Sequence, residues 1–580
     1  METLSLHALR ILRERYLLRS NDGDRMESPE QLVRRVAKAI AKAELEWGGH
    51  EVADRWEGVF AKLMSGLYFL PNSPTLMNAG TPQGQLSACF VLPVEDSLSS
   101  IYDSLKMAAK VHQKGGGTGF NFSKLRPTGD SLGRGGGKAS GPVSFIRLFD
   151  FSTEQVKQGG KRRGANMGVL NVDHPDIFEF VQLRTNGKPL QNFNLSVGVT
   201  DAFMQAVEKD KAWELIHPRT GKAVKQVQAK VLWQAIVESA WESGNPGMIF
   251  LDTINAFQPL PSQGRIWSTN PCGEVPLLPF ESCNLGSVNL SRLVRTGEQG
   301  QMEVDWEKLA YVVRAGIRFL DNVIEVNRYP HPHIAKSSRA SRKVGLGVMG
   351  WAELLILLGI PYASDQAVDL AEKLMEFVKE KSRDASRELA RERGTFSLWE
   401  NSVFYPDLPL RNATLTSIAP TGTISILADT TSSIEPLFAL AFHRKGVLEG
   451  GSMVSDVHPL FLKAVSGKGL DENHILQEVR KSGSCMGLGE VPSELKELFR
   501  TALEISPEWH LRHQLAFQKH TDNAVSKTVN LPSSATVDDI ANIYREAWEQ
   551  KAKGITVFRN ASNIDKVLHT GLGAACKPAG

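Results

Sequence analysis

Two spacings of apolar residues follow one another along the chain, and they predict helices first and buried strands afterwards. Residues 30–46 repeat apolar positions at helical spacing, namely Leu32, Val33, Val36, Ala37, Ile40 and Ala43. From about Leu67 onward, short apolar runs are separated by Gly, Pro, Asn and Ser, which is typical of buried strands. Such runs occupy residues 87–94, 193–199 and 415–418. We therefore expect a small N-terminal helical region over residues 1–65, followed by strands.

Helices with clear ends alternate with these runs. One helix is predicted to start after Ser364 and to end at Gly394. Another begins at Thr536, where Asp539 gives the spacing of a capping box, and stops at Gly554. Short buried strands that alternate with helices favour an α/β fold with mainly parallel pairing. The last residues, 561–580, are expected to form a flexible tail.

The composition is that of an ordinary globular protein. Of the 580 residues, 42% are hydrophobic and 23% are charged, and 67 basic residues face 64 acidic ones, which leaves a net charge of +3. This balance gives no reason to expect a nucleic-acid or membrane partner. The sequence shows no signal peptide and no apolar run long enough to span a membrane. We therefore expect a cytoplasmic protein.

The cysteines are few and scattered. There are 5, and no two of them form a Cys-x-x-Cys pair. A disulfide scaffold and a structural zinc site are therefore not expected, and no metal site is predicted. Scattered cysteines are usually small core residues, so each needs an argument of its own. They are Cys89, Cys272, Cys283, Cys485 and Cys576.

The most informative segment surrounds Cys272, which lies between a proline and a glycine in the run Asn-Pro-Cys-Gly-Glu at residues 270–274. Proline and glycine disfavour regular structure, so a loop tip that presents the sulfur is predicted. In an extended loop, Asn270, Cys272 and Glu274 would point to the same side. A thiol, a carboxylate and an amide together can take a hydrogen atom, accept a proton and orient hydroxyls. On spacing alone, a structural turn with a buried cysteine and an exposed glutamate is the favoured interpretation.

The context of this loop resembles the ribonucleotide reductase family. A second cysteine, Cys283, follows eleven residues after Cys272 in the run Cys-Asn-Leu-Gly. Upstream, Cys89 lies in a run similar to the strand and turn that carry the family's other redox cysteine. Similar runs in the family's order are KQGGKRRG at 157–164, APTGTIS at 419–425 and TDNAVSK at 521–527. The resemblance covers most of the chain, from about Leu67 to Arg559.

The resemblance implies a fold and a mechanism. The fold would be a ten-stranded α/β barrel of two parallel half-sheets over residues 66–560, with a central finger loop near residues 270–283. Cys272 would become a thiyl radical and remove the 3′ hydrogen of a ribonucleotide. Glu274 would accept the 3′-hydroxyl proton, and Asn270 would bind the ribose hydroxyls. Cys89 and Cys283 would form a disulfide in each turnover, which requires the two cysteines to meet within disulfide geometry.

The resemblance also implies two nucleotide sites. Hydroxyls and glycine-freed backbone amides suit phosphate binding, and cations interleaved with glycine suit an effector nucleotide. The implied substrate-binding residues are Ser73, Thr75, Ala88, Gly117, Ala419, Pro420, Thr421, Gly422, Thr423 and Ser425. The implied effector-binding residues are Asp96, Arg126, Lys157, Gln158, Lys161 and Arg162. The family places its effector site at a dimer interface, so a homodimer is expected, with deoxyribonucleoside triphosphates as effectors.

The radical source is inferred from the sequence features that each branch of the family needs to generate its radical. A glycyl-radical enzyme needs a C-terminal glycine site with a neighbouring tyrosine, and residues 555–580 contain no tyrosine. An enzyme with a separate radical-storing subunit uses an adjacent tyrosine pair, and none of the 8 tyrosines are adjacent. Adenosylcobalamin needs neither device. The runs at 343–350 and 553–559 also resemble the adenosylcobalamin-dependent branch most closely. His458, in an incomplete cobalt-ligation motif, is interpreted as structural, and Cys485 as a bystander.

Several points remain open on sequence grounds. Cys576 is the only cysteine near the C-terminus, so the Cys-x-x-Cys shuttle of many members is missing, truncated or supplied by another chain. A thioredoxin- or glutaredoxin-like reductant is expected. The N-terminal region is too short for the family's ATP-binding cone, so specificity regulation without overall on/off control is expected. The substrate would be a ribonucleoside diphosphate or triphosphate, the former in the dimeric subgroup. Alternatives are a reductase served by a radical-generating protein, a non-catalytic nucleotide-binding regulator, and an inactive fragment that needs a separate redox chain.

Overall fold

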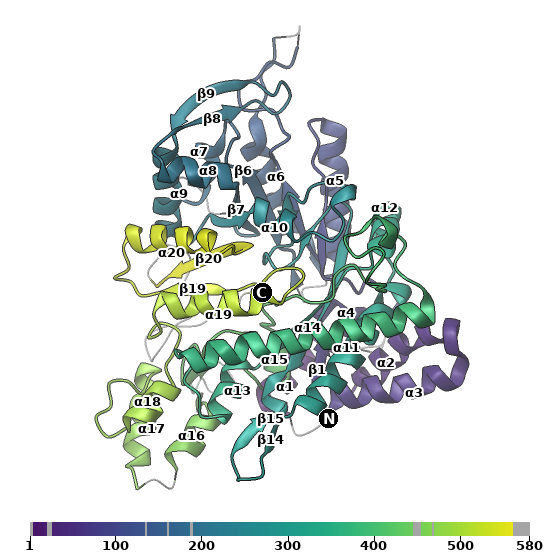
Figure 1. Ribbon diagram of the computed structural model, residues 1–580, viewed down its shortest axis with the longest axis vertical. Helices are drawn as coiled ribbons and strands as arrows, with labels where there is room; N and C mark the ends of the chain where they lie inside the picture. Colours follow the sequence, from purple (N-terminus) through teal and green to yellow (C-terminus); the bar gives the residue numbers. More distant parts are fainter. Residues whose placement is uncertain are drawn as a thin grey trace.

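The computed structural model describes residues 4–19, 26–133, 136–158, 162–185, 190–444, 454–466 and 469–560 (Figure 1). The predicted tail over residues 561–580, with Cys576, lies outside the described residues. Within the described chain, no helix combines the length and the apolar character needed to cross a membrane.

Ten strands form one sheet at the centre of the molecule. Their spans are β1 (Phe69–Pro71), β2 (Cys89–Val91), β3 (Gly117–Asn121), β6 (Asn166–Asn171), β7 (Phe193–Val199), β10 (Gly247–Phe250), β13 (Ser282–Asn289), β16 (Val344–Met349), β19 (Thr528–Leu531) and β20 (Gly554–Arg559). Strands β1, β2, β10, β13 and β16 are buried along their whole length, as expected for strands covered on both faces.

Two groups of parallel strands make up most of this sheet, and β1 lies at one end, antiparallel to β13. Strands β2, β3, β6, β7 and β10 are parallel to one another, and so are the pairs β13–β16 and β19–β20. The two groups meet in antiparallel pairs, β2 with β13 and β10 with β20. Parallel bridges from Leu346 to Thr416 and from Ile418 to Val525 connect β16 to the segment before β19. The strands therefore close into a barrel of two parallel half-sheets, and the predicted fold is confirmed.

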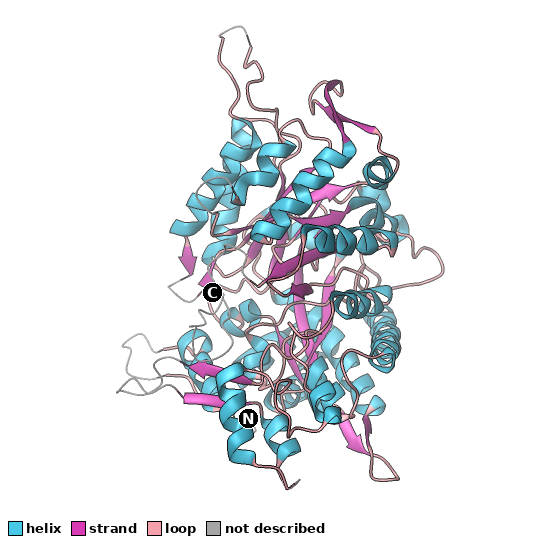
Figure 2. Cartoon of the chain, turned by 90° about the vertical axis from the view of Figure 1, so that its left-hand side faces the viewer, coloured by secondary structure: helices cyan, strands magenta, loops and turns pink. Residues whose placement is uncertain are grey.

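Helices surround the strands on the outside, as Figure 2 shows. The longer ones are α5 (Leu98–Gln113), α6 (Gly141–Gln155), α9 (Ala229–Ser243), α11 (Trp306–Val326), α12 (Pro332–Ser341), α14 (Asp365–Arg393), α19 (Pro507–Lys519) and α20 (Val537–Glu549). Two large apolar clusters fill the space between helices and strands, one around β1, β13 and β16, and the other around β2, β3, β6, β7, β10, β19 and β20. Smaller clusters, which include Cys89 and Cys283, lie on the inner side. The helices thus bury the outer faces of the strands and leave the inner faces for the site.

The N-terminal region consists of α1 (Leu6–Ile11), the π-helical turn η1 (Leu12–Tyr16), α2 (Pro29–Ala41), the 3-10 turn η2 (Lys42–Glu44) and α3 (Leu45–Ser65). It packs on the barrel domain at several places: α2, η2 and α3 contact α11, α3 also contacts β1, and α1 contacts α15 (Ile424–Leu427). The predicted helix over residues 30–46 is helical, but α2 ends at Ala41 and a 3-10 turn follows. That turn carries the Glu44 side chain into the interior, where it is fully buried.

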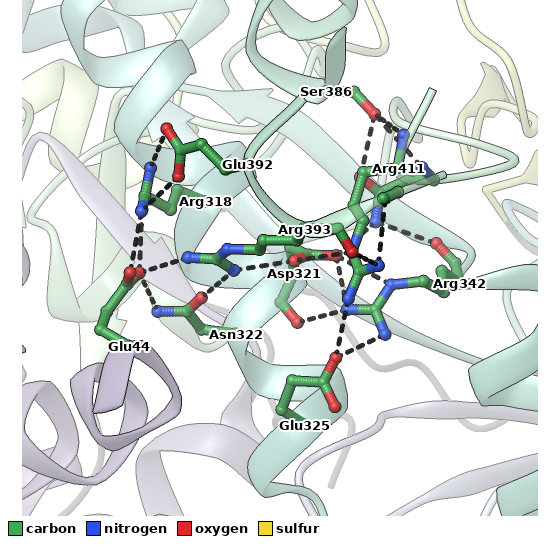
Figure 3. A network of polar contacts seen from close by, with 12 residues as sticks. Glu44, Arg318, Asp321, Asn322, Glu325, Arg342, Ser386, Glu392, Arg393 and Arg411 are labelled. Atoms are coloured by element: carbon green, nitrogen blue, oxygen red, sulfur yellow. Dashed lines mark hydrogen bonds and ion pairs between the residues drawn. The ribbon is translucent and has the colours of Figure 1, made fainter. Parts of the chain in front are cut away.

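Glu44 takes part in a buried network of charged side chains (Figure 3). Its carboxylate accepts hydrogen bonds from Arg318 and Arg393 at 2.7–2.8 Å. Asp321 of α11 accepts from Arg342 at 2.7 Å and from Arg393 at 3.0 Å. The labelled members in Figure 3 are Glu44, Arg318, Asp321, Asn322, Glu325, Arg342, Ser386, Glu392, Arg393 and Arg411. The network joins the N-terminal helices to α11, α14 and the loops beside them.

Shorter elements complete the chain. They are α4 (Ser73–Asn78), β4 (Lys157–Gln158), β5 (Arg162–Arg163), α7 (Ile177–Val181), α8 (Asp201–Glu208), β8 (Ala212–Ile216), β9 (Ala223–Gln228), α10 (Leu251–Ala256), β11 (Ser268–Thr269), β12 (Pro276–Leu277), β14 (Val294–Thr296), β15 (Met302–Val304), α13 (Trp351–Leu357), α15 (Ile424–Leu427), β17 (Ala441–Arg444), β18 (Val454–Val457), α16 (Pro459–Val465), α17 (Glu472–Ser482) and α18 (Ser493–Leu498). Helices α16–α18 have an apolar core of their own, which includes Cys485.

Candidate active site

The loop that carries Cys272 is the tip of a hairpin made by β11 and β12. β11 contacts β2, β3 and β6 of the first half-sheet. The approach is so close that a Cβ atom at Gly119 of β3 would lie 1.7 Å from the Thr269 carbonyl oxygen. Only glycine permits this contact between the barrel wall and the hairpin. On the same side, the Asn194 amide donates a hydrogen bond to the Pro271 carbonyl oxygen at 2.8 Å.

The second half-sheet holds the hairpin from the other side. The Glu274 carbonyl oxygen accepts hydrogen bonds from the Ser417 hydroxyl and the Ala524 amide, both at 2.9 Å. Ala524 lies in the family-like run at residues 521–527, and Ser417 lies two residues before the run at residues 419–425. The hairpin is therefore bound to both halves of the barrel, which is the arrangement expected of a central finger loop.

The tip exposes the thiol and buries the carboxylate. Cys272 is exposed, whereas Glu274 is 2% exposed. Gly273 has a φ of 83°, and a Cβ atom added there would meet no atom within 4 Å. This is the reverse of a structural turn with a buried cysteine and an exposed glutamate, so that alternative is wrong. The positive φ turns the chain so that Cys272 faces open space while Glu274 points inward.

Asn270 connects the carboxylate to Cys89, which the sequence predicts to be a redox cysteine. Its Nδ2 atom donates to Glu274 Oε2 at 2.7 Å and lies 3.1 Å from Cys89 Sγ. Its Oδ1 atom accepts from the Val275 amide at 2.9 Å, which fixes the orientation of the side chain. The Cys89 thiol, 181 residues from Asn270 in the sequence, thus joins the amide and carboxylate of the loop in one buried cluster.

Cys89 and Cys283 lie directly opposite each other in the antiparallel pair of β2 and β13. Directly opposed residues in such a pair have Cα atoms roughly 4.5–5.5 Å apart. A disulfide needs a Cα separation of about 4.4–6.8 Å. The requirement that the two cysteines meet within disulfide geometry is therefore satisfied by the strand register.

The surroundings of Cys283 keep it a neutral thiol. Burial raises the pKa of Cys283 far above its ordinary value, and the nearby Lys343 ammonium opposes this shift only in part. Lys343 is itself buried, and its Nζ atom lies 2.6 Å from Glu281 Oε2. Glu281 also accepts the Leu278 amide at 2.8 Å. This ion pair beside the redox cysteine was not predicted, because it depends on the register between β13 and β16.

Two of the predicted substrate residues line the finger loop itself. The Gly117 amide donates to the Ala88 carbonyl oxygen at 2.7 Å, so the two are adjacent in the sheet. A Cβ atom at Gly117 would lie 2.7 Å from Pro271 Cγ. The small size of Gly117 is therefore needed for the finger loop, whatever room it also leaves for a nucleotide.

The predicted phosphate residues come from α4 and from the segment before α15. Three of their hydroxyls are buried and used inside the protein. Thr75 donates to Asn72 at 2.9 Å, Thr421 accepts the Ser433 amide at 2.7 Å, and the Ser425 and Ser432 hydroxyls lie 3.1 Å apart. Two hydroxyls, those of Ser73 and Thr423, are only half-buried. Beside them, Pro420 and Gly422 are exposed, and Ala419 is mostly buried.

Two of the predicted effector residues, Asp96 and Arg126, lie together near the start of α5. Arg126 and Asp96 form an ion pair, with Arg126 Nε 3.0 Å from Asp96 Oδ2. Arg219, from the turn between β8 and β9, lies 3.6 Å from the same carboxylate and was not predicted. Lys157, Gln158 and Arg162 belong to the hairpin of β4 and β5. The side chains of these three and all of Lys161 lie outside the described residues.

Two residues set aside on sequence grounds have local partners. His458, which precedes α16, has its Nε2 atom 3.2 Å from Oε1 of Glu353 in α13. Burial raises the pKa of Cys485 to about 11 within the core of α16–α18. Among the residues that the structure describes, no group of three His, Cys, Asp or Glu side chains is placed to hold a metal ion.

Comparison with known proteins identifies the family. The sequence model described as "Ribonucleotide reductase, barrel domain" matches residues 87–408 and 406–558, and "Ribonucleotide reductase, all-alpha domain" matches residues 2–84. The chain belongs to the ribonucleotide reductase family.

Relatives identify the branch of the family. The chain is 51% identical to the vitamin B12-dependent ribonucleoside-diphosphate reductase of Mycobacterium tuberculosis (strain CDC 1551 / Oshkosh), over 99% of this chain and 82% of the relative. It is 44% identical to the enzyme of the same name from Thermoplasma acidophilum, over 99% and 81%. Among solved structures, the Actinobacillus ureae class Id ribonucleotide reductase alpha subunit is 26% identical, with a TM-score of 0.79 over 97% of this chain and 98% of that one. The resemblance to the adenosylcobalamin-dependent branch is confirmed.

Proposed function

We propose that this ribonucleotide reductase uses adenosylcobalamin to convert ribonucleoside diphosphates to 2′-deoxyribonucleoside diphosphates, the precursors of DNA. The arrangement of the finger loop carries the proposal. Cys272 is exposed at the tip, Asn270 and Glu274 are buried behind it, and Cys89 contacts the same amide. The names of the relatives support the diphosphate substrate and the cobalamin cofactor.

The cofactor is proposed to approach the exposed side of the finger loop. Cys272 is exposed, and the space beside Gly273 contains no protein atom within 4 Å of an added Cβ. When bound, adenosylcobalamin supplies the radical by homolysis of its Co–C bond. The thiol of Cys272 would give its hydrogen atom to that radical and become a thiyl radical, which removes the 3′ hydrogen of the ribose and returns a hydrogen atom to the same carbon once the ribose is reduced.

Glu274 and Asn270 handle the ribose hydroxyls. The Glu274 carboxylate accepts the 3′-hydroxyl proton, because it is the buried base at this end of the loop. The Asn270 amide holds the carboxylate at 2.7 Å and binds the hydroxyls. Its own carbonyl is fixed by the Val275 amide, so the side chain is oriented before substrate arrives.

Cys89 and Cys283 supply two electrons and two protons. The 2′-hydroxyl leaves as water, a hydrogen replaces it on the ribose, and the two thiols become one disulfide. The raised pKa of Cys283 keeps its proton available for this step. An external dithiol protein of the thioredoxin or glutaredoxin type then reduces the disulfide for the next turnover.

Substrate phosphates bind at α4 and the segment before α15, and a deoxyribonucleoside triphosphate effector binds at the start of α5. The ion pair between Asp96 and Arg126 supports the effector site, because it brings together two residues proposed to contact effector ribose and phosphate. We assign residues 1–65 to the N-terminal helical region and 66–560 to the barrel domain.

The first test is a cobalamin-dependent assay. Purified protein is incubated without oxygen with a ribonucleoside diphosphate, excess dithiothreitol and each deoxyribonucleoside triphosphate in turn, with or without adenosylcobalamin. We expect deoxyribonucleotide only in the reactions that contain the cofactor, because Cys272 needs its radical source. Equal product without cofactor would disprove the cobalamin proposal, and product only from triphosphates would disprove the diphosphate substrate.

The homodimer is proposed to form through α5 and α6, which pack together and expose apolar side chains. Leu98 and Tyr102 of α5 are 66% and 55% exposed, and Phe151 of α6 is 67% exposed. Exposed apolar side chains grouped on one surface are typical of an interface. Asp96, proposed to bind the effector, lies just before the start of α5, which supports an effector site beside the proposed dimer interface.

Charge on this surface is expected to separate the subunits. In the double variant Leu98→Glu and Tyr102→Glu, sedimentation velocity should show mainly monomer at concentrations where the unaltered protein is dimeric, because two buried carboxylates oppose association. The matched control is Val403→Glu with Tyr405→Glu, two similarly exposed residues elsewhere on the surface. A variant that stays dimeric, or a control that also dissociates, would show that the interface lies elsewhere.

A further inference from the structure

The π-helical turn η1 in the N-terminal region lies against both segments of the proposed phosphate site. It contacts α4, and the adjoining helix α1 contacts α15. Two consecutive side chains of η1 reach the site. Tyr16 Oη lies 2.7 Å from Ser73 Oγ, and Arg15 Nη1 lies 3.5 Å from Thr423 Oγ1. Isolated π-helical turns occur frequently at functional sites.

These two contacts fall on the hydroxyls that the protein interior leaves accessible. Thr75, Thr421 and Ser425 are buried and bound to partners inside the protein. Ser73 and Thr423 are half-buried, and they are the hydroxyls beside Tyr16 and Arg15. The N-terminal region therefore covers the accessible part of the phosphate site.

Arg15 is a half-buried cation without a carboxylate partner among the described residues. Its neighbours on the same turn differ. Glu14 pairs with Arg10 at 2.7 Å, and Arg13 is exposed to solvent. A guanidinium that is partly removed from water and is paired only with a hydroxyl attracts an anion.

We propose that Arg15 binds the phosphates of the substrate together with Thr423, and that Tyr16 positions the Ser73 hydroxyl for the same group. This inference rests on the phosphate site proposed above and adds the N-terminal region to it. A planar guanidinium can donate two parallel hydrogen bonds to phosphate oxygens, which lysine cannot do. Arg15 is then a specificity residue that favours a diphosphate over a monophosphate, and Tyr16 is a positioning residue.

The test measures nucleotide binding rather than turnover. Isothermal titration without cobalamin compares a ribonucleoside diphosphate with the corresponding monophosphate. Arg15→Gln should weaken diphosphate binding by about tenfold to a hundredfold, because a charge-assisted hydrogen bond is lost. Monophosphate affinity should change less. The diphosphate affinity of Arg15→Lys should lie between that of Arg15→Gln and that of the unaltered protein. The matched control, Arg13→Gln on the same turn, should bind both nucleotides like the unaltered protein.

A second variant separates failure of this inference from failure of the phosphate site. Thr423→Val removes the hydroxyl and keeps the side-chain shape. If Thr423→Val weakens diphosphate binding and Arg15→Gln does not, the role of Arg15 is wrong and the phosphate site stands. If neither variant changes binding, the phosphate site itself is wrong. Equal loss of diphosphate and monophosphate affinity in Arg15→Gln would also overturn the proposed selectivity. Unchanged thermal unfolding of each variant confirms that its fold is intact.

Discussion

Cys272→Ser is expected to stop deoxyribonucleotide formation while leaving the structure intact. The side chain is exposed at the tip of the finger loop, so a hydroxyl there buries no new polar group. An O–H bond is stronger than an S–H bond, so serine cannot take over the radical. We expect turnover to fall by about 10³-fold or more, since each 1.36 kcal/mol added to the barrier slows the reaction tenfold. The measurement is product formed per enzyme with adenosylcobalamin and dithiothreitol.

The control for this variant is Cys485→Ala. Cys485 packs in the core of α16–α18, away from the finger loop, and its thiol takes no part in the proposed reaction. That variant should retain turnover. Diphosphate binding by Cys272→Ser should also match the unaltered protein, because the sulfur is not part of the phosphate site. Retained turnover in Cys272→Ser would disprove its role as the radical residue.

Local pattern predicted the type of several elements well. The helix expected after Ser364 is α14, in which the Ser364 hydroxyl caps the Ala367 amide and Gly394 follows the last residue. The strand expected at residues 193–199 is β7 over the same residues. The helix that begins at Thr536 ends at Glu549, earlier than the predicted Gly554, because β20 begins at Gly554. Residues 415–418 take part in single bridges to neighbouring strands.

The chemistry of the site could be predicted from a short motif, but its partners could not. The run Asn-Pro-Cys-Gly-Glu carries the reacting groups within five consecutive residues, so the sequence itself groups them. The contact of Arg15 with Thr423 joins residues 408 positions apart, and that of Lys343 with Glu281 joins residues 62 apart. Such contacts depend on strand register and helix packing, which a single sequence does not encode in any local pattern.

Asp321→Asn is expected to be the most destabilising of the conservative substitutions in the buried network of Figure 3. Asp321 is fully buried and accepts hydrogen bonds from Arg342, Arg393 and Asn412. Removing its charge takes one counter-ion from buried guanidinium groups, which then share only Glu44 and Glu325 among the described residues. Breaking a buried ion pair by removal of one partner typically costs about 3–5 kcal/mol of the free energy of unfolding. Urea unfolding followed by circular dichroism should show a midpoint shifted to lower urea.

The pH dependence of this stabilisation has a definite sign. Burial alone would raise the pKa of Asp321, but Arg342, Arg411 and Arg393 lower it below its ordinary value. A carboxyl with a lowered pKa in the folded state stabilises the fold fully above its ordinary pKa, and the stabilisation is lost as pH falls through the lowered value. The difference in unfolding free energy between the unaltered protein and Asp321→Asn should therefore persist at neutral pH and shrink only below about pH 4.

An exposed ion pair provides the comparison. Arg295 and Glu303, 2.7 Å apart in the β14–β15 hairpin, are 55% and 39% exposed. Glu303→Gln should change the free energy of unfolding by less than about 1 kcal/mol, because solvent screens such pairs. If Asp321→Asn costs no more than this control, the buried charges do not hold the N-terminal helices to the barrel. A large cost would fit the interruption at Ala41 of a helix whose amphipathic pattern continues to residue 46, since the 3-10 turn brings Glu44 to Arg393, which Asp321 also binds.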